Sequence, residues 1–143
     1  MARVKVDLPD SFSFATEIPV RITDLNYGGH LGNDALLGIL HEARVHFLRS
    51  LGLENDYDPV SKLGLIMVDV AMEYKGEAFH GDVLHIKMAA ADPNKYGFDV
   101  VYHLHNQAGK EIARAKTGML CFDYRVRKLR LLPAALAASV AQS

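Results

Sequence analysis

The middle of the chain repeats apolar residues at the spacing of an α-helix, in steps of three or four. The members of this stripe are Leu36, Leu40, Ala43, Phe47 and Leu51. Further apolar residues widen it, so we expect a helix over residues 34–51 that the fold largely encloses. Asn33 or Asp34 can cap its start, and Gly52 stands where a left-handed residue often ends a helix. Gly38 costs this helix about 1 kcal/mol relative to alanine, which a close approach of another backbone would explain.

The remainder of the chain alternates apolar and polar residues as β-strands do. A first run, Phe12 to Ile22, contains Pro19 and is predicted to lie near a sheet edge or to carry a bulge. Short turn signals separate the later runs, which predicts an antiparallel meander. These four runs are Leu63 to Tyr74, Val83 to Ala91, Tyr96 to Asn106 and Ile112 to Val126. The segment from Pro133 to Ala141 is alanine-rich, either a short helix or a frayed tail.

This order of elements predicts an α+β fold in which one long central helix is wrapped by a curved antiparallel sheet of about five strands. The length of 143 residues suits one domain over residues 1–143. Such a sheet leaves an edge strand exposed, and pairing across a two-fold axis would cover it. We therefore expect a homodimer at least, with a homotetramer as the larger option.

Composition and charge narrow the class of partner. The net charge of −1 gives no basic footprint for nucleic acid, and no run approaches the roughly 18 apolar residues that span a bilayer. Cys121 is the single cysteine, and the first ten residues lack the apolar core of a signal peptide. The histidines form no metal-binding motif. We expect a cytoplasmic protein with a small-molecule or protein partner, and no nucleic acid, membrane or metal.

Polar chemistry gathers in the segment from Asp24 to Asp34. Three glycines and five Asp, Asn or His side chains lie there, directly before the predicted helix. Polar side chains and unpaired backbone N–H groups therefore meet at the N-terminus of one helix. This is where we expect the functional site.

The loop and the helix resemble those of hot-dog-fold thioesterases, specifically acyl-CoA thioester hydrolases of the 4-hydroxybenzoyl-CoA thioesterase type and their acyl-carrier-protein relatives. The family's loop reads approximately D-x-D-x-x-G-H-x-N-N, matched here over residues 24–33, and its helix carries the Glu-Ala-Arg found at residues 42–44. The turn signals of the meander and Pro133 agree as well. The resemblance covers nearly the whole chain. It implies a hot-dog fold that hydrolyses an acyl-CoA or acyl-carrier-protein thioester, with no cofactor except coenzyme A as part of the substrate.

The sequence departs from the family at two loop positions. Asn26 occupies the place of the second aspartate, which acts in the family as general base or nucleophile, and Gly32 replaces the first of the paired asparagines. An amide can neither accept a proton as a carboxylate does nor attack a carbonyl. Either another carboxylate has taken over the role, or the chain is a non-hydrolytic acyl-CoA or acyl-carrier-protein binding module. The aspartate-then-histidine pattern of hot-dog hydratases is absent.

Four side chains are candidates for catalysis: Asn26, His30, Asp34 and Glu42. Asn26 can orient a water or bond the thioester oxygen. His30 can polarise the carbonyl or act as a base, or simply fix the loop by a hydrogen bond. Asp34 and Glu42 project about 80° apart and two turns apart on a helix, so both can face one groove. Their alternatives are an N-cap for Asp34 and a solvated charged face for Glu42.

The backbone N–H groups of Leu31, Gly32 and Asn33 are the candidate oxyanion donors. Three further loop residues, Asp24, Gly28 and Gly29, are expected to support the loop. A basic cluster ends the last predicted strand and consists of Arg125, Arg127, Lys128 and Arg130. It either binds the phosphates of coenzyme A or is a solvated basic end.

Overall fold

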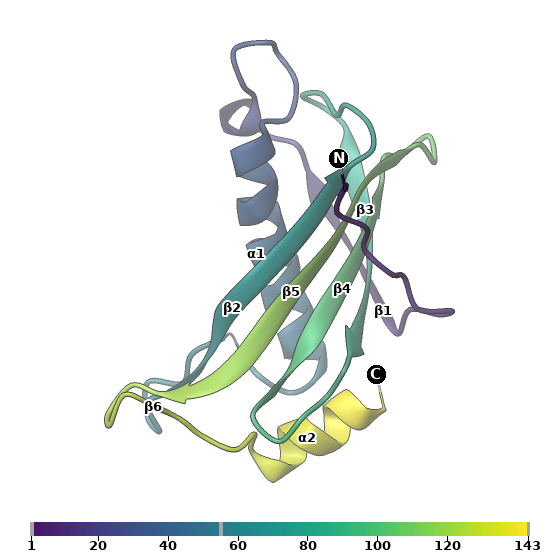
Figure 1. Ribbon diagram of the computed structural model, residues 1–143. Helices are drawn as coiled ribbons and strands as arrows, with labels where there is room; N and C mark the ends of the chain where they lie inside the picture. Colours follow the sequence, from purple (N-terminus) through teal and green to yellow (C-terminus); the bar gives the residue numbers. More distant parts are fainter. Residues whose placement is uncertain (1, 55, 143) are drawn as a thin grey trace.

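A long helix lies across one face of a curved antiparallel sheet in the computed structural model, which describes residues 2–54 and 56–142 (Figure 1). The elements are β1 (Phe14–Pro19), η1 (Ile22–Asp24, a 3₁₀ turn), α1 (Asn33–Ser50), β2 (Leu63–Tyr74), β3 (Val83–Ala91), β4 (Gly97–His105), β5 (Glu111–Asp123), β6 (Lys128–Leu129) and α2 (Ala134–Ala141). The six-stranded sheet has the order β1-β3-β4-β5-β2, and β6 pairs with β5. The predicted α+β fold is confirmed, with β6 as a short strand beyond the five expected.

Three strands are shorter than their sequence patterns indicated: β1 and β5 each end three residues earlier, and β4 lacks one residue at each end. β1 begins at Phe14 and ends at Pro19, because the chain then turns into η1. β5 ends at Asp123, since the Asp123 carboxylate accepts the N–H groups of Arg125 (2.8 Å) and Val126 (3.3 Å). This side-chain turn reverses the chain into β6. The basic residues after Asp123 therefore lie on a hairpin instead of continuing the strand.

The start of α1 differs from the prediction, whereas its end agrees. The N-cap residue is Gly32, which is extended (ψ 147°) and has no side chain to cap the helix. Asn33 and Asp34 already belong to the first turn, so neither is the N-cap. At the other end, Gly52 has a φ of 98°, the left-handed conformation that glycine adopts without strain.

The helix is enclosed on one side only. Its sheet-facing residues are buried, including Leu36, Leu40 and Phe47, while Asp34, Gly38 and other residues of the opposite face are exposed. The prediction that the fold encloses most of the helix is therefore wrong for a single chain. A Cβ built on Gly38 meets no heavy atom of the described residues within 4 Å. The expected close approach of another backbone to Gly38 does not occur within this chain.

The exposed position of Gly38 gives a stability prediction. Gly38→Ala removes backbone freedom from the unfolded chain and adds a methyl group that meets nothing, so we expect stabilisation by about 1 kcal/mol. Denaturant unfolding of both proteins measures this difference. Destabilisation would mean that a backbone from outside this chain packs on this face of α1.

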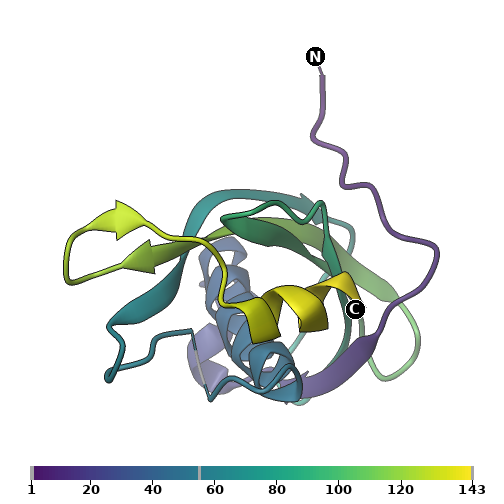
Figure 2. The ribbon, with the colours of Figure 1, turned by 90° about the horizontal axis from the view of Figure 1, so that it is seen from below.

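The core lies between α1 and the sheet, and α2 covers its lower end with Leu136 and Val140 (Figure 2). Arg44, which is only 6% exposed, donates from Nη1 to the Tyr102 hydroxyl (3.3 Å), which in turn bonds the hydroxyl of Thr117 (2.7 Å). Burial raises the pKa of Tyr102, so its hydroxyl remains a neutral bridge. Neither helix, within the part of the chain that the structure describes, is long and apolar enough to cross a membrane.

β2 forms an open edge of the sheet. It pairs with β5 on one side, and on the other the loop before it covers only its first residues, where Tyr57 bridges to Gly64. Beyond Gly64, β2 carries three exposed apolar residues near one another in the sequence: Met67, Val68 and Val70. Exposed apolar side chains on an edge strand favour pairing with another chain.

Candidate active site

The loop before α1 is organised by the side chain of Asn26. Its Oδ1 accepts the N–H groups of Gly28 (2.9 Å) and His30 (3.4 Å), and its backbone N–H donates to the carbonyl of His30 (2.8 Å). Gly29 completes the turn with a φ of 81°, which favours glycine. The amide oxygen of Asn26 is therefore committed to the loop, and its Nδ2 group is the part that can reach a ligand.

Asp24 holds the other end of the loop. The buried carboxylate accepts the backbone N–H of Arg21 (2.8 Å) and pairs with its guanidinium (3.1 Å), and the Asp24 carbonyl accepts the N–H of Gly32 (2.9 Å). Burial alone would raise the pKa of Asp24, but the hydrogen bonds from Arg21 outweigh it and leave this pKa below its usual value. A charged Asp24 thus fixes the chain where it enters the helix.

Two of the three expected oxyanion donors are already used. The N–H of Leu31 donates to the carbonyl of Ala78 (2.7 Å), and the N–H of Gly32 donates to Asp24. The prediction of these two groups as oxyanion donors is therefore wrong. The N–H of Asn33, in the first turn of α1, has no hydrogen-bond partner among the described residues. It is the donor of the predicted set that remains available.

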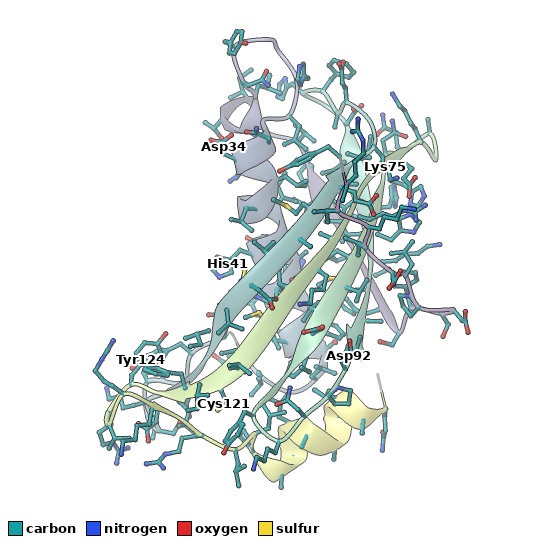
Figure 3. All side chains as sticks on the ribbon, viewed as in Figure 1. Asp34, His41, Lys75, Asp92, Cys121 and Tyr124 are labelled. Atoms are coloured by element: carbon teal, nitrogen blue, oxygen red, sulfur yellow. The ribbon has the colours of Figure 1, made fainter. Side chains whose placement is uncertain are left out.

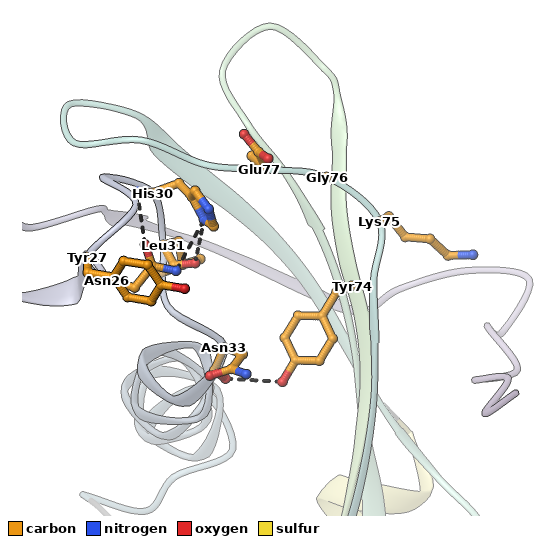
Figure 4. Close-up of a pocket in the computed structure, with 9 residues that line it drawn as sticks. All are labelled: Asn26, Tyr27, His30, Leu31, Asn33, Tyr74, Lys75, Gly76 and Glu77. Atoms are coloured by element: carbon orange, nitrogen blue, oxygen red, sulfur yellow. Dashed lines mark hydrogen bonds between the residues drawn. The ribbon is translucent and has the colours of Figure 1, made fainter.

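A cavity of about 660 Å³ lies between this loop and the end of β2 (Figure 4). This volume is in the range of small-molecule sites. Its lining residues are Asn26, Tyr27, His30, Leu31, Asn33, Tyr74, Lys75, Gly76 and Glu77. The loop and the segment after β2 are joined by the bond from Leu31 to Ala78, so the two walls of the cavity are fixed to each other.

The structure brings only part of the predicted catalytic set into this cavity. Asn26 and His30 line it, while Asp34 and Glu42 do not. Glu42 pairs with His46 (2.8 Å), whose other ring nitrogen bonds Thr16 on β1 (2.7 Å). Glu42 therefore belongs to the charged face on the β1 side of the helix, the alternative that its sequence spacing left open. Asp34 is exposed beside Gly32 at the helix start.

His30 lies on the cavity wall without a strong hydrogen bond. Its Nδ1 is 3.5 Å from Nδ2 of Asn26 and 3.4 Å from the carbonyl oxygen of Leu31. Both distances are long for a hydrogen bond, so neither contact fixes the tautomer of the ring. His30 can consequently face a ligand as a donor or as an acceptor.

Five lining residues have no counterpart in the sequence prediction: Tyr27, Tyr74, Lys75, Gly76 and Glu77. Two of them, Tyr74 and Glu77, bring polar groups that matter for the site. The Tyr74 hydroxyl donates to the carbonyl of Asn33 (3.1 Å) and joins the end of β2 to the start of α1. Glu77 is the one carboxylate among the described residues that line the cavity. Its local sequence reads as an ordinary turn, and only the long-range contact between Leu31 and Ala78 reveals that Glu77 faces the loop.

The basic cluster lies at the other end of the molecule. Figure 3 labels Tyr124, beside the cluster, and Asp34, beside the loop, at opposite ends of α1. Arg130 pairs with Asp123 (3.1 Å), and Arg125 donates to the carbonyl of Ser61 (3.1 Å). Two cations remain near the tip of the hairpin: Arg127, which lies 5.6 Å over the Phe122 ring, and exposed Lys128. No part of this cluster reaches the cavity of its own chain.

Other reactive groups lie outside the cavity. His103 bonds Glu111 (2.6 Å), and the hydrogen bond from Arg114 lowers the pKa of Glu111 to about 2. Cys121 is buried, and its burial raises the pKa of the thiol. No cluster of three metal-ligating side chains occurs within residues 2–54 and 56–142.

Comparisons with known proteins agree with this fold. A family model described as the thioesterase-like superfamily matches residues 20–140, and a search of curated proteins found no match. Similar solved structures include a 1,4-dihydroxy-2-naphthoyl-CoA thioesterase from Synechocystis (22% identity, TM-score 0.80, covering 90% of this chain and 95% of that one). A probable thioesterase from Escherichia coli has 25% identity, a TM-score of 0.72 and coverage of 90% and 96%.

A third structure, a hypothetical protein from Staphylococcus aureus in complex with CoA, has 15% identity and a TM-score of 0.84, covering 96% of this chain and 87% of that one. These likenesses identify the architecture of α1 and the sheet as the hot-dog fold. The family match extends over most of the sequence, from the end of β1 to α2. The chain belongs to the thioesterase-like superfamily.

Proposed function

We propose that this protein hydrolyses acyl-CoA thioesters in the cavity between the 24–34 loop and the end of β2. The observation that carries the proposal is the unpaired N–H of Asn33, which lies at the N-terminus of an 18-residue helix on the wall of this cavity. A backbone donor at the positive end of a helix stabilises a developing oxyanion without reorganisation. The naphthoyl-CoA thioesterase and the CoA complex among the similar structures support a CoA thioester as substrate.

The reaction follows from the polarity of the walls. The thioester carbonyl oxygen accepts the N–H of Asn33, which draws electron density from the carbonyl carbon. Asn26 and His30 also line the cavity, and Nδ2 of Asn26 and the ring of His30 offer further donors. Water then attacks the carbon, and the C–S bond breaks to release the acid and the thiol of coenzyme A.

We propose that the protein acts as a homodimer formed along β2. The other edge strand, β1, has six residues and carries Pro19, features that disfavour pairing with a second chain. Residues 66–74 of β2 have no strand partner on the outer edge, and Met67, Val68 and Val70 among them are exposed. A second copy of the same strand, related by a two-fold axis, would cover both apolar stretches at once.

Antiparallel pairing of β2 has a consequence for the cavity. An axis near Val70, the middle of the uncovered stretch, places Leu63 of one copy beside the end of β2 in the other. Leu63 pairs with Asp123, where the basic hairpin begins. Arg127 and Lys128 of the partner subunit would therefore stand at the mouth of the cavity, as contacts for the phosphates of coenzyme A.

The test is release of free thiol from a panel of short, long, aromatic and hydroxylated acyl-CoA thioesters. Turnover well above the spontaneous rate on any member is the expected result. Cys121 is buried, so its thiol adds little to the background of the thiol reagent, and replacing it removes what remains. Absence of turnover on the whole panel would overturn the proposed hydrolysis of CoA thioesters.

One observation favours a second candidate, a non-hydrolytic module that binds acyl-CoA or an acyl-carrier protein. Asn26 supplies no carboxylate at the position where the family carries an aspartate. Tight binding of an acyl-CoA without any turnover is the result that this candidate predicts. Calorimetry with a stable thioether analogue separates binding from hydrolysis.

The role of Asn26 in the loop leads to a paired prediction. Asn26→Ala removes the acceptor for the N–H groups of Gly28 and His30, so we expect a looser loop and about a tenfold loss of kcat/KM. Asn26→Asp keeps a side-chain oxygen in that place, and we expect a melting temperature close to that of the wild type. Steady-state kinetics and thermal unfolding check both variants. Full activity of the alanine variant would contradict this positioning role.

A further inference from the structure

The proposed hydrolysis requires a group that takes a proton from water, and Asn26 has no carboxylate for this purpose. We propose that Glu77 is the general base. This inference rests on the proposed function and assigns a catalytic residue within the same cavity. Glu77 follows β2, a part of the chain from which the resemblance to thioesterases takes no catalytic residue.

The backbone around Glu77 is held on both sides. The N–H groups of Lys75 and Gly76 both donate to the carbonyl of Ile112 (2.8 and 3.1 Å), and the carbonyl of Ala78 accepts the N–H of Leu31. A Cβ on Gly76 would come within 2.9 Å of the carbonyl oxygen of Glu111, so the segment packs tightly against β5. Bonds on each side of Glu77 therefore fix the point from which its side chain leaves the backbone.

The side chains of Lys75 and Glu77 point in different directions (Figure 4). Lys75 points away from the cavity in Figure 4, and its ammonium group pairs with Glu73 (3.2 Å). Glu77 lines the cavity from the segment after β2, and Asn33 lines it from the start of α1. A carboxylate and an oxyanion donor on separate walls suit a carbonyl held on one side and a water approaching from the other.

Glu77 is also available. It is exposed and has no ion pair or hydrogen bond to any described residue. Three other carboxylates near this end of the fold have partners: Asp24 pairs with Arg21, Glu73 accepts the N–H of Val6 (2.7 Å), and Asp82 accepts the N–H of Phe79 (2.8 Å). Asp34 is exposed as well, but it does not line the cavity. A carboxylate without an internal partner keeps its oxygens free to accept a proton from water.

The step balances without a co-reactant. Glu77 accepts one proton from water while the water oxygen bonds to the thioester carbon, and the carbonyl electrons move to the oxygen held by Asn33. When the carbonyl reforms, the C–S bond breaks and its electron pair stays on sulfur. Glu77 returns the proton to that thiolate, which gives the acid, the free thiol and an ionised Glu77.

The experiment measures kcat and KM for Glu77→Gln on the best substrate of the panel. We expect kcat to fall on the order of 10²-fold with KM nearly unchanged. Glu77→Asp, which keeps a carboxylate on a shorter stem, should recover part of this loss. Glu17→Gln is the matched control, an exposed glutamate on β1 that should keep full activity.

Two further variants, Asp34→Asn and Glu42→Gln, test the other carboxylates, and we expect both to stay within about threefold of the wild type. Thermal unfolding and sedimentation of Glu77→Gln show whether it remains folded with the assembly of the wild type. A folded Glu77→Gln protein with full activity would overturn the role of Glu77 and leave the thioesterase in place. Wild-type protein without turnover would overturn both proposals.

Discussion

Reversing the charges at the tip of the β5–β6 hairpin, with Arg127→Glu and Lys128→Glu together, is expected to raise KM for acyl-CoA about a hundredfold. Each cation would lose a charge-assisted bond to a phosphate, worth about 1.5 kcal/mol or roughly tenfold in affinity. These residues lie at the opposite end of α1 from the cavity of their own chain (Figure 1). Their effect on turnover therefore requires the second copy.

Mixed dimers separate this arrangement from a site within one chain. A Glu77→Gln copy lacks the base, and a charge-reversed copy lacks the phosphate contacts, so each homodimer should be nearly inactive at low substrate concentration. In a mixed dimer, the intact cavity of the charge-reversed copy faces the intact hairpin of the other copy. Random reassembly gives half mixed dimers with one complete site each, and thus recovery of about a quarter of wild-type activity.

The control uses a truncated thioester, an acyl-pantetheine that carries no nucleotide phosphates. Its turnover should not respond to the charge reversal, because the hairpin has no phosphate to bind. No recovery in the mixed dimers would place both groups in one chain and refute the shared site. Equal losses on the truncated substrate would show that the charge reversal damages the fold, since no phosphate contact is at stake.

The central helix and the meander could be predicted because their determinants are local. The stripe containing Leu36, Leu40 and Phe47 repeats at helical spacing, and these residues are buried against the sheet. Gly52 ends the helix through its own left-handed conformation. The stripe could not show that the opposite face of the helix is exposed. The width of an apolar stripe does not specify how many elements of the chain cover the helix.

The site was less predictable because it depends on contacts between distant parts of the chain. The N–H of Leu31 is unavailable to a ligand only because the carbonyl of Ala78 reaches it. The same contact brings Glu77 to the cavity, although nothing around residue 77 resembles a catalytic motif. Glu42 is the opposite case. Its place in the helical Glu-Ala-Arg made it a candidate for catalysis, whereas in the fold it pairs with His46.

Gly97 is the position where a single added methyl group should destabilise the fold most. It lies at the start of β4 and pairs with Leu120 of β5. A Cβ built there overlaps the carbonyl oxygen of Met119 and lies 2.9 Å from Cα of Leu120. Both obstacles are backbone atoms, so a change of side-chain rotamer cannot relieve them.

The strands cannot easily separate at this point either. The N–H of Cys121 donates to the carbonyl of Tyr96 (2.7 Å), and Asn94 accepts the N–H of Gly97 at its side chain (3.0 Å). We therefore expect Gly97→Ala to cost about 3 kcal/mol, with a melting temperature lower by about 10 °C. Gly38→Ala is the matched control, the same substitution at a position with open space. Denaturant and thermal unfolding measure both variants, and a Gly97→Ala protein as stable as the wild type would show that β4 and β5 can move apart here at little cost.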